Sequence, residues 1–215
     1  MAAVTVFCRS TVGKKVVLAV TGVVLFVFLM GHLLGNLLIF VGRAQLNAYA
    51  AFLKSTGELL WIVRLILLGA LLLHILTSVQ ITLANWKARP IGYTAKQDVE
   101  TGYAARTMIL SGPLIFLYVI YHLLMFTFLT TGPGYSETDV FRNVVQAFQV
   151  PAISGVYILA MVILGMHLYH GVWSMCQTLG LEWSHGRRTI ATITGVVIAG
   201  GYILIPMAVL AGVLR

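Results

Sequence analysis

The chain has very little charge, and this scarcity decides its class. Of its 215 residues, 9% are charged and 60% are hydrophobic, whereas about 25% of the residues of a soluble domain are charged. A chain so poor in charge cannot present an ordinary water-facing surface. We therefore expect an integral membrane protein with no separate soluble domain.

Cysteine is also scarce, and this excludes some redox chemistry. Cys8 and Cys176 are the two cysteines, and the sequence has neither a CxxC nor a CxxCH motif. Covalent attachment of a c-type haem and a cysteine-ligated iron–sulfur cluster on this chain are therefore both disfavoured.

Long apolar stretches are what the chain has instead. The segments run over 16–41, 59–86, 107–131, 151–179 and 189–213. Each reaches the ~20 residues that a helix needs to cross a ~30 Å hydrocarbon core. The alternating segments of about ten residues that build a membrane β-barrel are absent, and the first stretch is too long for the apolar region of a signal peptide. The sequence predicts an all-α, multi-pass fold of five transmembrane helices, with residues 1–215 forming one membrane-embedded domain.

Basic residues predict the orientation of these helices. Placing the N-terminus in the cytoplasm puts nine Lys and Arg residues on the inner side and five on or near the outer side, as the positive-inside rule prefers. The inner nine are Arg9, Lys14, Lys15, Lys87, Arg89, Lys96, Arg106, Arg187 and Arg188. The net charge of +8 is thus attributed to membrane topology, and a nucleic-acid partner is disfavoured because no basic cluster alternates with aromatic residues.

Histidines inside the apolar stretches are the candidate functional residues. His32, His74, His122 and His167 lie in the first four stretches, one in each, and an ionisable residue at membrane depth is by default a functional-site hypothesis. His32 and His122 each lie nine residues before the outer end of their stretch, whereas His74 and His167 lie 15 and 16 residues in from it. At 1.5 Å per residue the two pairs lie about 13 and 23 Å below the outer surface.

Paired imidazoles without carboxylates favour haem iron over a hard cation. No Asp or Glu lies at mid-membrane depth, which disfavours a proton pump or ion transporter. Any one of these histidines could equally be an interhelical hydrogen-bond donor, but the matched set favours two non-covalent bis-histidine haems. We predict that His32 and His122 ligate the outer haem iron, that His74 and His167 ligate the inner one, and that each donates its other ring N–H to a backbone carbonyl.

Small residues near the histidines suggest room for a flat ligand. One turn after three of the four histidines comes a short side chain or glycine, and only Phe126, four residues after His122, departs from this pattern. His170 is the rival of His167 as fourth ligand, but it would lie deeper than His74. The haem-pocket candidates are Gly22, Asn36, Ser78, Arg106, Gly112, His170 and Gly171.

These segments resemble a known family. GKKVVLAVTGVVLFVFLMGHLLGN, SGPLIFLYVIYHLL and HLYHGVWSMCQTLG resemble the five-helix, dihaem cytochrome b subunit of succinate dehydrogenases and fumarate reductases. In that family a glycine follows the fourth-helix ligand after four residues, which corresponds here to Gly171 after His167. The resemblance covers essentially the whole chain.

The resemblance implies a membrane anchor in the inner (cytoplasmic) membrane that carries electrons in a respiratory chain. Its partners would be a flavoprotein with FAD and an iron–sulfur subunit with three clusters, and it would hold two haems b and a quinone site, usually for menaquinone. The dicarboxylate would react on the flavoprotein, so no catalytic residue is expected on this chain. The direction of catalysis and the dimerisation of the heterotrimer stay open.

The quinone site is less well defined. Glu58, at the outer start of the second stretch, is the candidate proton acceptor, and an ordinary interfacial carboxylate is the alternative. Leu46, Tyr49 and Leu53 belong to an amphipathic stripe nearby that could lie on the membrane surface. Two other functional classes are alternatives for the whole protein. One is the dihaem subunit of a hydrogenase or formate dehydrogenase, and the other is a haem-free transporter or assembly factor.

Overall fold

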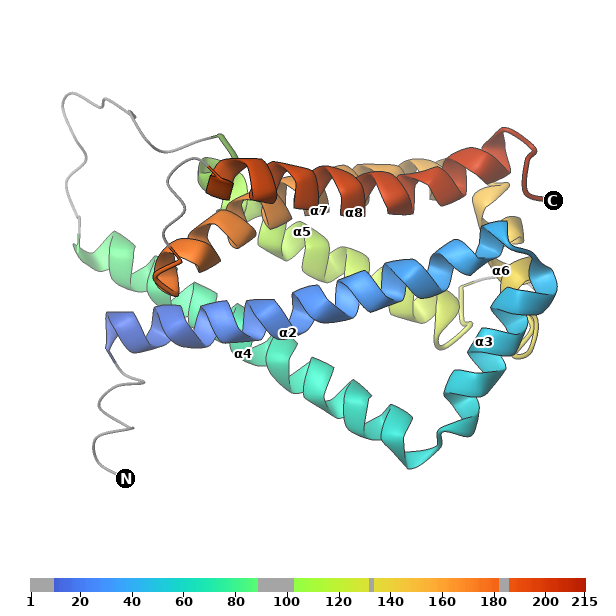
Figure 1. Cartoon of the computed structure of the whole chain (residues 1–215), viewed down its shortest axis with the longest axis horizontal. Helices are drawn as coiled ribbons and strands as arrows, with labels where there is room; N and C mark the ends of the chain where they lie inside the picture. Colours follow the sequence, from blue (N-terminus) through green and yellow to red (C-terminus); the bar gives the residue numbers. More distant parts are fainter. Residues whose placement is uncertain (1–9, 89–102, 132–133, 182–185) are drawn as a thin grey trace.

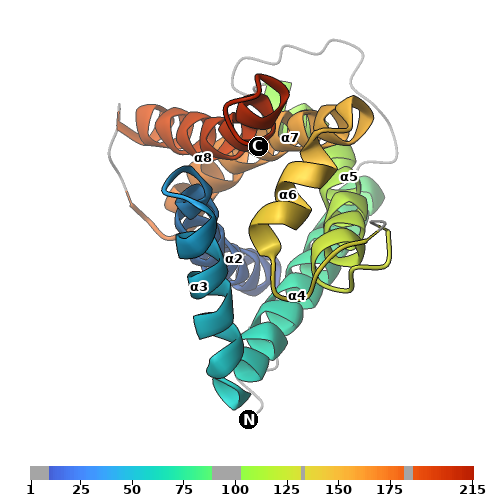
Figure 2. The same cartoon turned by 90° about the vertical axis from the view of Figure 1, so that its right-hand side faces the viewer.

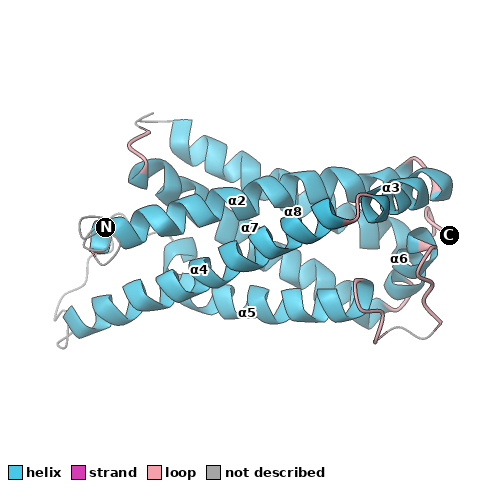
Figure 3. Cartoon of the chain, turned by 90° about the horizontal axis from the view of Figure 1, so that it is seen from below, coloured by secondary structure: helices cyan, strands magenta, loops and turns pink. Residues whose placement is uncertain are grey.

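The fold is built from helices throughout the part of the chain that the structure describes. This computed structural model describes residues 10–88, 103–131, 134–181 and 186–215, and it leaves the side chains of 103–106 and 187 undescribed. Figures 1 and 3 show helices, with no strand in these ranges. The long helices are α2 (Thr11–Leu37), α4 (Glu58–Ala88), α5 (Tyr103–Phe126), α7 (Pro151–Thr178) and α8 (Gly186–Leu210), and the shorter ones are η1 (Leu38–Phe40), α3 (Arg43–Ser55) and α6 (Val140–Phe148).

Five helices in the described ranges are long and apolar enough to cross a membrane. They are Thr11–Phe40, Glu58–Ala88, Thr107–Phe126, Pro151–Thr178 and Arg188–Leu210. The predicted all-α class and the five spans are therefore confirmed, and the chain is a membrane protein by the length and composition of its helices.

Two predicted helix boundaries were wrong by five residues, and each error has a local cause. The first helix begins at Thr11 rather than 16, because the Ser10 hydroxyl caps it by accepting a hydrogen bond from the Gly13 N–H at 3.0 Å. The third helix ends at Phe126 rather than 131. The chain leaves the helix there through Leu129, whose positive φ of 55° ends the helical path.

The described helices form two similar units followed by α8. In each unit two long helices pack against each other and are joined through one short helix: α2, α3 and α4 in the first, and α5, α6 and α7 in the second. The two short helices lie at the same end of the molecule (Figures 1 and 2), and α8 packs against α7 and α2. The first four long helices therefore pack as two pairs, which α8 joins.

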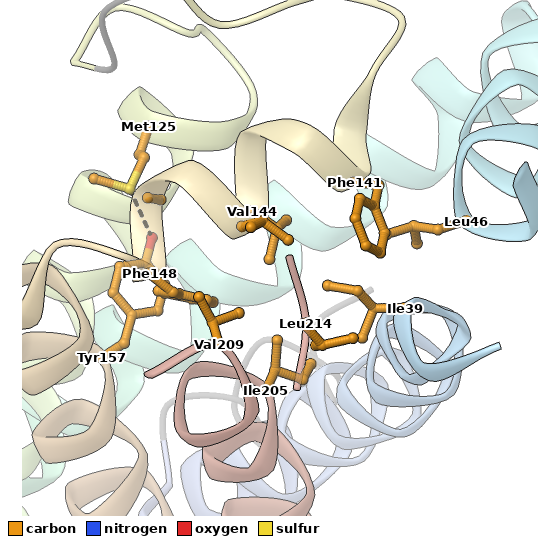
Figure 4. Close-up of a cluster of buried hydrophobic side chains, with 12 residues drawn as sticks. Ile39, Leu46, Met125, Phe141, Val144, Phe148, Tyr157, Ile205, Val209 and Leu214 are labelled. Carbon is orange, nitrogen blue, oxygen red and sulfur yellow. Dashed lines mark hydrogen bonds between the residues drawn. The ribbon is translucent and has the colours of Figure 1, made fainter. Parts of the chain in front are cut away.

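A hydrophobic cluster fills the end of the molecule where α3 and α6 lie. Ile39, Leu46, Met125, Phe148 and Tyr157 are among its buried members (Figure 4). The amphipathic stripe of α3 thus buries Leu46 in protein, and α3 packs against α6. The alternative that the whole stripe lies on the membrane surface is therefore wrong for Leu46.

Asp139 links the two short helices. It forms a salt bridge with Arg43, accepts a hydrogen bond from the Asn47 amide at 2.9 Å, and caps α6 by accepting from the Arg142 backbone N–H at 3.2 Å. The Asn47 side-chain oxygen, Oδ1, accepts from the Phe141 backbone N–H at 3.0 Å. The Asn47 amide, followed by Arg43 and the Arg142 N–H, holds the pKa of the Asp139 carboxyl below its ordinary value.

A pair of glycines lets α7 and α8 approach closely. A Cβ added to Gly195 would lie 2.7 Å from the Gly165 carbonyl oxygen, and one added to Gly165 would lie 3.0 Å from the Ala199 Cβ. Small residues at such crossings are how membrane helices gain packing without a hydrophobic driving force. The α7–α8 contact therefore depends on the absence of side chains at these two positions.

We expect Gly195→Ala to destabilise the protein, because the new methyl would meet backbone of α7 that cannot move away locally. The expected loss is about 1–3 kcal/mol, the usual cost of overpacking, and it should appear as a lower thermal unfolding midpoint in detergent. Gly200→Ala is the matched control on the same helix, because nothing lies within 4 Å of its added Cβ. An equal loss in both variants would contradict the close α7–α8 contact.

The link through Asp139 should depend on pH. The pKa of Asp139 is lowered from 3.8 by folding, so its ionised form stabilises the fold above about pH 4. That contribution is lost as the pH falls through the lower folded-state pKa. We expect the difference in unfolding midpoint between the native chain and Asp139→Asn to be constant from about pH 7 to 5 and to shrink below about pH 4. A difference that persists undiminished at the lowest pH would show that the charge is not its source.

Candidate functional site

The four membrane histidines lie on the first four long helices and are all half-buried. His74 and His167 each lie 16 residues after the first residue of their helices, Glu58 and Pro151. These two histidines are therefore equally far from the start of their helices. The equal spacing predicted for the other pair is wrong, because His32 lies eight residues before the end of its span at Phe40 and His122 four before the end of α5 at Phe126.

The structure brings His32 and His122 together. Their ring centroids are 5.9 Å apart, and the ring planes stand at 86° to each other. Phe28 stacks on His32 with a centroid distance of 5.2 Å, and Tyr202 from α8 lies 6.1 Å from it. The pair therefore lies in an aromatic environment contributed by α2, α5 and α8.

This spacing suits two imidazoles that share one iron. A metal ion lies about 2 Å from an imidazole nitrogen, and that nitrogen lies about 1 Å from its ring centroid, so two opposed ligands have centroids about 6 Å apart. The observed 5.9 Å allows this arrangement; it is also an ordinary ring contact distance, shared by Tyr118 and His122, so it shows that the two imidazoles are neighbours. The donor set also fits haem, which takes two axial imidazoles because its porphyrin supplies the other ligands.

Tyr157 contacts His122 on its ring nitrogen. The Tyr157 hydroxyl lies 3.3 Å from His122 Nδ1 and donates to the Met125 Sδ at 3.6 Å, a contact that is visible in Figure 4. Tyr118 lies 5.9 Å from His122 and packs edge-on against Tyr157 at 5.1 Å. The hydrogen bond to Nδ1 leaves Nε2 as the nitrogen of His122 that can bind a metal.

His74 and His167 each meet a hydroxyl group from the partner helix of their unit. Thr21 Oγ1 on α2 lies 3.1 Å from His74 Nδ1, and Ser111 Oγ on α5 lies 3.2 Å from His167 Nδ1. The rings of His74 and His167 are close enough to interact electrostatically. Both histidines therefore have Nδ1 engaged in the same way, which again leaves Nε2 for a ligand.

The rival histidine, His170, has different surroundings. The His170 ring packs edge-on against Trp173, with ring centroids 6.1 Å apart. The Arg188 guanidinium lies over the same Trp173 ring, 5.6 Å from its centroid. Ser111 contacts His167 and not His170. These contacts place His170 beside a cation–π pair, apart from the hydroxyl of α5.

The small residues proposed for the haem pocket differ in how close they lie to the histidine rings. A Cβ on Gly22 would lie 3.5 Å from His74 Cε1, whereas Gly112 and Gly171 face open space within 4 Å. Ser78 is exposed, and the Asn36 amide donates to the backbone carbonyl of its neighbour His32 at 2.7 Å.

The other predicted site residues are peripheral or not described. Glu58, the quinone-site candidate, is exposed at the start of α4. The side chain of Arg106, the candidate partner of a haem propionate, lies outside the described residues. Phe126, which broke the pattern of small residues, lies 5.6 Å from His122, stacks on Tyr135 at 6.3 Å and meets Phe148 at 6.1 Å. Its bulk therefore belongs to the cluster at the α3–α6 end.

The ring-nitrogen partners of the histidines were predicted only in part. Backbone carbonyls were expected, and His74 does form a hydrogen bond with the Leu18 backbone. The hydroxyl groups of Thr21, Ser111 and Tyr157, which were not expected, contact ring nitrogens of His74, His167 and His122. A signal was present in the sequence, because Thr21 lies 11 residues before His32 and Ser111 lies 11 before His122. Eleven residues are slightly more than three helical turns, so each hydroxyl lies on the same helix face as a histidine, toward the interior of the bundle.

Among the described residues, no group of three or more His, Cys, Asp or Glu side chains could hold a metal ion on its own. The paired imidazoles are therefore the metal-ligating feature that these ranges offer. A scan of protein-family models, a search of curated proteins and a search of solved structures each return no match to this chain.

Proposed function

We propose that this chain is the cytochrome b membrane anchor of a succinate dehydrogenase or fumarate reductase complex. It would pass electrons between a quinone, menaquinone in the first instance, and an iron–sulfur subunit through two haems b. The observation that carries the proposal is that two imidazoles from different helices, His32 and His122, lie side by side in the bundle with their ring centroids 5.9 Å apart, close enough to hold one metal ion between them. The resemblance of the three sequence motifs to that family supports the same assignment.

Four histidines would hold the two haems. His32 and His122 would bind one iron, and His74 and His167 the other. His74, His122 and His167 would bind through Nε2, because a hydroxyl contacts the Nδ1 of each. A haem held by two imidazoles carries single electrons and offers no open position for oxygen chemistry. The residues of this chain would orient the imidazoles and keep water away from them.

Two ligand pairs at different depths suit electron transfer across a membrane. His32 follows Thr21 by 11 residues on α2, and Thr21 contacts His74. This spacing corresponds to about 16 Å along the helix axis between the two pairs, more than the ~10 Å expected from the sequence. Moving one charge across the membrane changes its free energy by ~2.3 kcal/mol per 100 mV. A chain of two centres could therefore couple quinone chemistry on one side to the membrane potential.

The soluble partners would dock at the end opposite α3 and α6. That end carries Lys14, Lys15, Lys87 and Arg188, whose charges suit a cytoplasmic location. An iron–sulfur subunit, bound in turn to a flavoprotein with FAD, would contact this end. Exposed Glu58, at the α3–α6 end, remains our candidate for proton exchange with a quinone near the opposite surface.

A reduced-minus-oxidised spectrum of the purified chain tests the proposal. We expect the α-band of low-spin haem b and a pyridine haemochrome count of two haems per chain. His167→Ala should remove one haem because it deletes an axial ligand, whereas His170→Ala is the matched control and should retain both.

Absence of the α-band in the native chain would overturn the proposed function. Two haems in His167→Ala together with one in His170→Ala would keep the function but reassign the fourth ligand.

A further inference from the structure

We propose that Thr21 and Ser111 are positioning residues that fix the tautomer of His74 and His167 and lower the reduction potential of the haem between them. This proposal rests on the proposed function, because it assigns a role toward the haem that His74 and His167 would ligate. It adds two residues whose hydroxyl groups act through the ligands and do not touch the iron.

The contacts of Thr21 determine where its hydroxyl proton goes. Thr21 Oγ1 lies 2.8 Å from the Val17 carbonyl oxygen, 3.1 Å from the Leu18 carbonyl oxygen and 3.1 Å from His74 Nδ1. A carbonyl oxygen can only accept, so the hydroxyl proton is directed to the backbone. An oxygen lone pair then faces Nδ1 and accepts its proton, which leaves Nε2 unprotonated and able to bind iron. The Leu18 backbone, to which His74 also forms a hydrogen bond, is a second acceptor beside this hydroxyl.

Ser111 repeats the arrangement in the second unit. Its Oγ lies 3.2 Å from the Met108 carbonyl oxygen and 3.2 Å from His167 Nδ1, and Ser111 is 4% exposed. Thr21 is buried to a similar degree, at 7% exposure. Two hydroxyls from different helices thus make the same pair of contacts, one to their own helix backbone and one to a histidine of the adjacent helix.

The burial of these hydroxyls gives the contact its strength. Inside the membrane no water replaces a lost partner, so an imidazole N–H without an acceptor costs free energy. Each hydroxyl therefore selects the Nδ1–H tautomer and limits rotation of the ring, as outer partners of metal-binding histidines do.

The electronic consequence follows from the direction of donation. An imidazole that donates its Nδ1 proton to an acceptor becomes a stronger electron donor to its metal. Stronger donation stabilises ferric over ferrous iron, so it lowers the reduction potential. His74 and His167 each have a hydroxyl acceptor. We therefore expect removal of either hydroxyl to raise the reduction potential of their haem, and removal of both to raise it further.

Redox titration of the purified full-length chain tests this inference. Thr21→Val and Ser111→Ala remove a hydroxyl, whereas Thr21→Ser and Ser111→Thr keep one. We expect each removal to raise the midpoint potential of one haem, so that its ratio of reduced to oxidised form at the native midpoint increases about threefold. The hydroxyl-keeping variants should titrate as the native chain does.

Thr178→Val is the control, because the Thr178 hydroxyl donates to the Ser174 carbonyl of its own helix at 3.0 Å but no histidine contact accompanies it.

The spectra and haem counts separate the outcomes. Loss of one haem in Thr21→Val with retention in Thr21→Ser would also support the inference, because the hydroxyl is then required for ligation. Two haems with unchanged potentials in Thr21→Val and Ser111→Ala would overturn it, as would equal changes in the hydroxyl-removing and hydroxyl-keeping variants. A native chain without haem would instead refute the proposed function.

Discussion

The hydrogen bond between a helix-borne hydroxyl and a membrane imidazole is the interaction on which this structure depends. An imidazole in hydrocarbon has two ring nitrogens and no water to satisfy them. Thr21 satisfies one nitrogen of His74, Ser111 one of His167, and Tyr157 one of His122. In each case the bond joins two helices and leaves the same nitrogen, Nε2, for a ligand. One contact thus links helix packing to the chemistry of the site.

The architecture supports these contacts from both sides. α2 pairs with α4 and α5 with α7, and each hydroxyl–histidine bond lies within such a pair. The cluster around α3 and α6 fixes one end of both pairs (Figure 4). The glycine contact between α7 and α8, together with the Tyr202 hydroxyl that donates to the Leu29 carbonyl at 2.9 Å, joins the second pair to α2. α8 therefore holds the two units in register although it carries none of the four histidines.

Much of the fold could be predicted from the sequence because apolar length is a property of single segments. The five spans follow from hydropathy alone, and so does the placing of one histidine in each of the first four. The distance of His122 from its helix end was predicted wrongly, because α5 ends at Phe126. Helix ends were harder to predict, because the Ser10 cap and the turn at Leu129 depend on a few local hydrogen bonds. α6 was missed altogether, since a helix of nine residues is too short for a hydropathy pattern and gains its stability from Asp139 and the buried cluster.

The candidate site also has features that single segments reveal and features that depend on how the helices pack. That His32 lies beside His122 and His74 near His167 could be inferred from spacing, but the residues around them depend on which helix faces meet. Tyr157 and Tyr202 come from α7 and α8, and nothing in a single segment indicates that they approach His122 and His32. Phe126 had no explanation from spacing, and its position in the aromatic cluster became evident only with Tyr135 and Phe148 beside it.

The central claim is that the four histidines act as two specific pairs, and a haem count on double variants tests it most directly. Because His32 and His122 share one iron in this account, the variant with both changed to Ala should keep one haem per chain, as should the variant with His74 and His167 changed. Changing one member of each pair, as in His32→Ala with His74→Ala, should leave none. One haem remaining in that mixed variant and none in the His32/His122 variant would contradict the pairing.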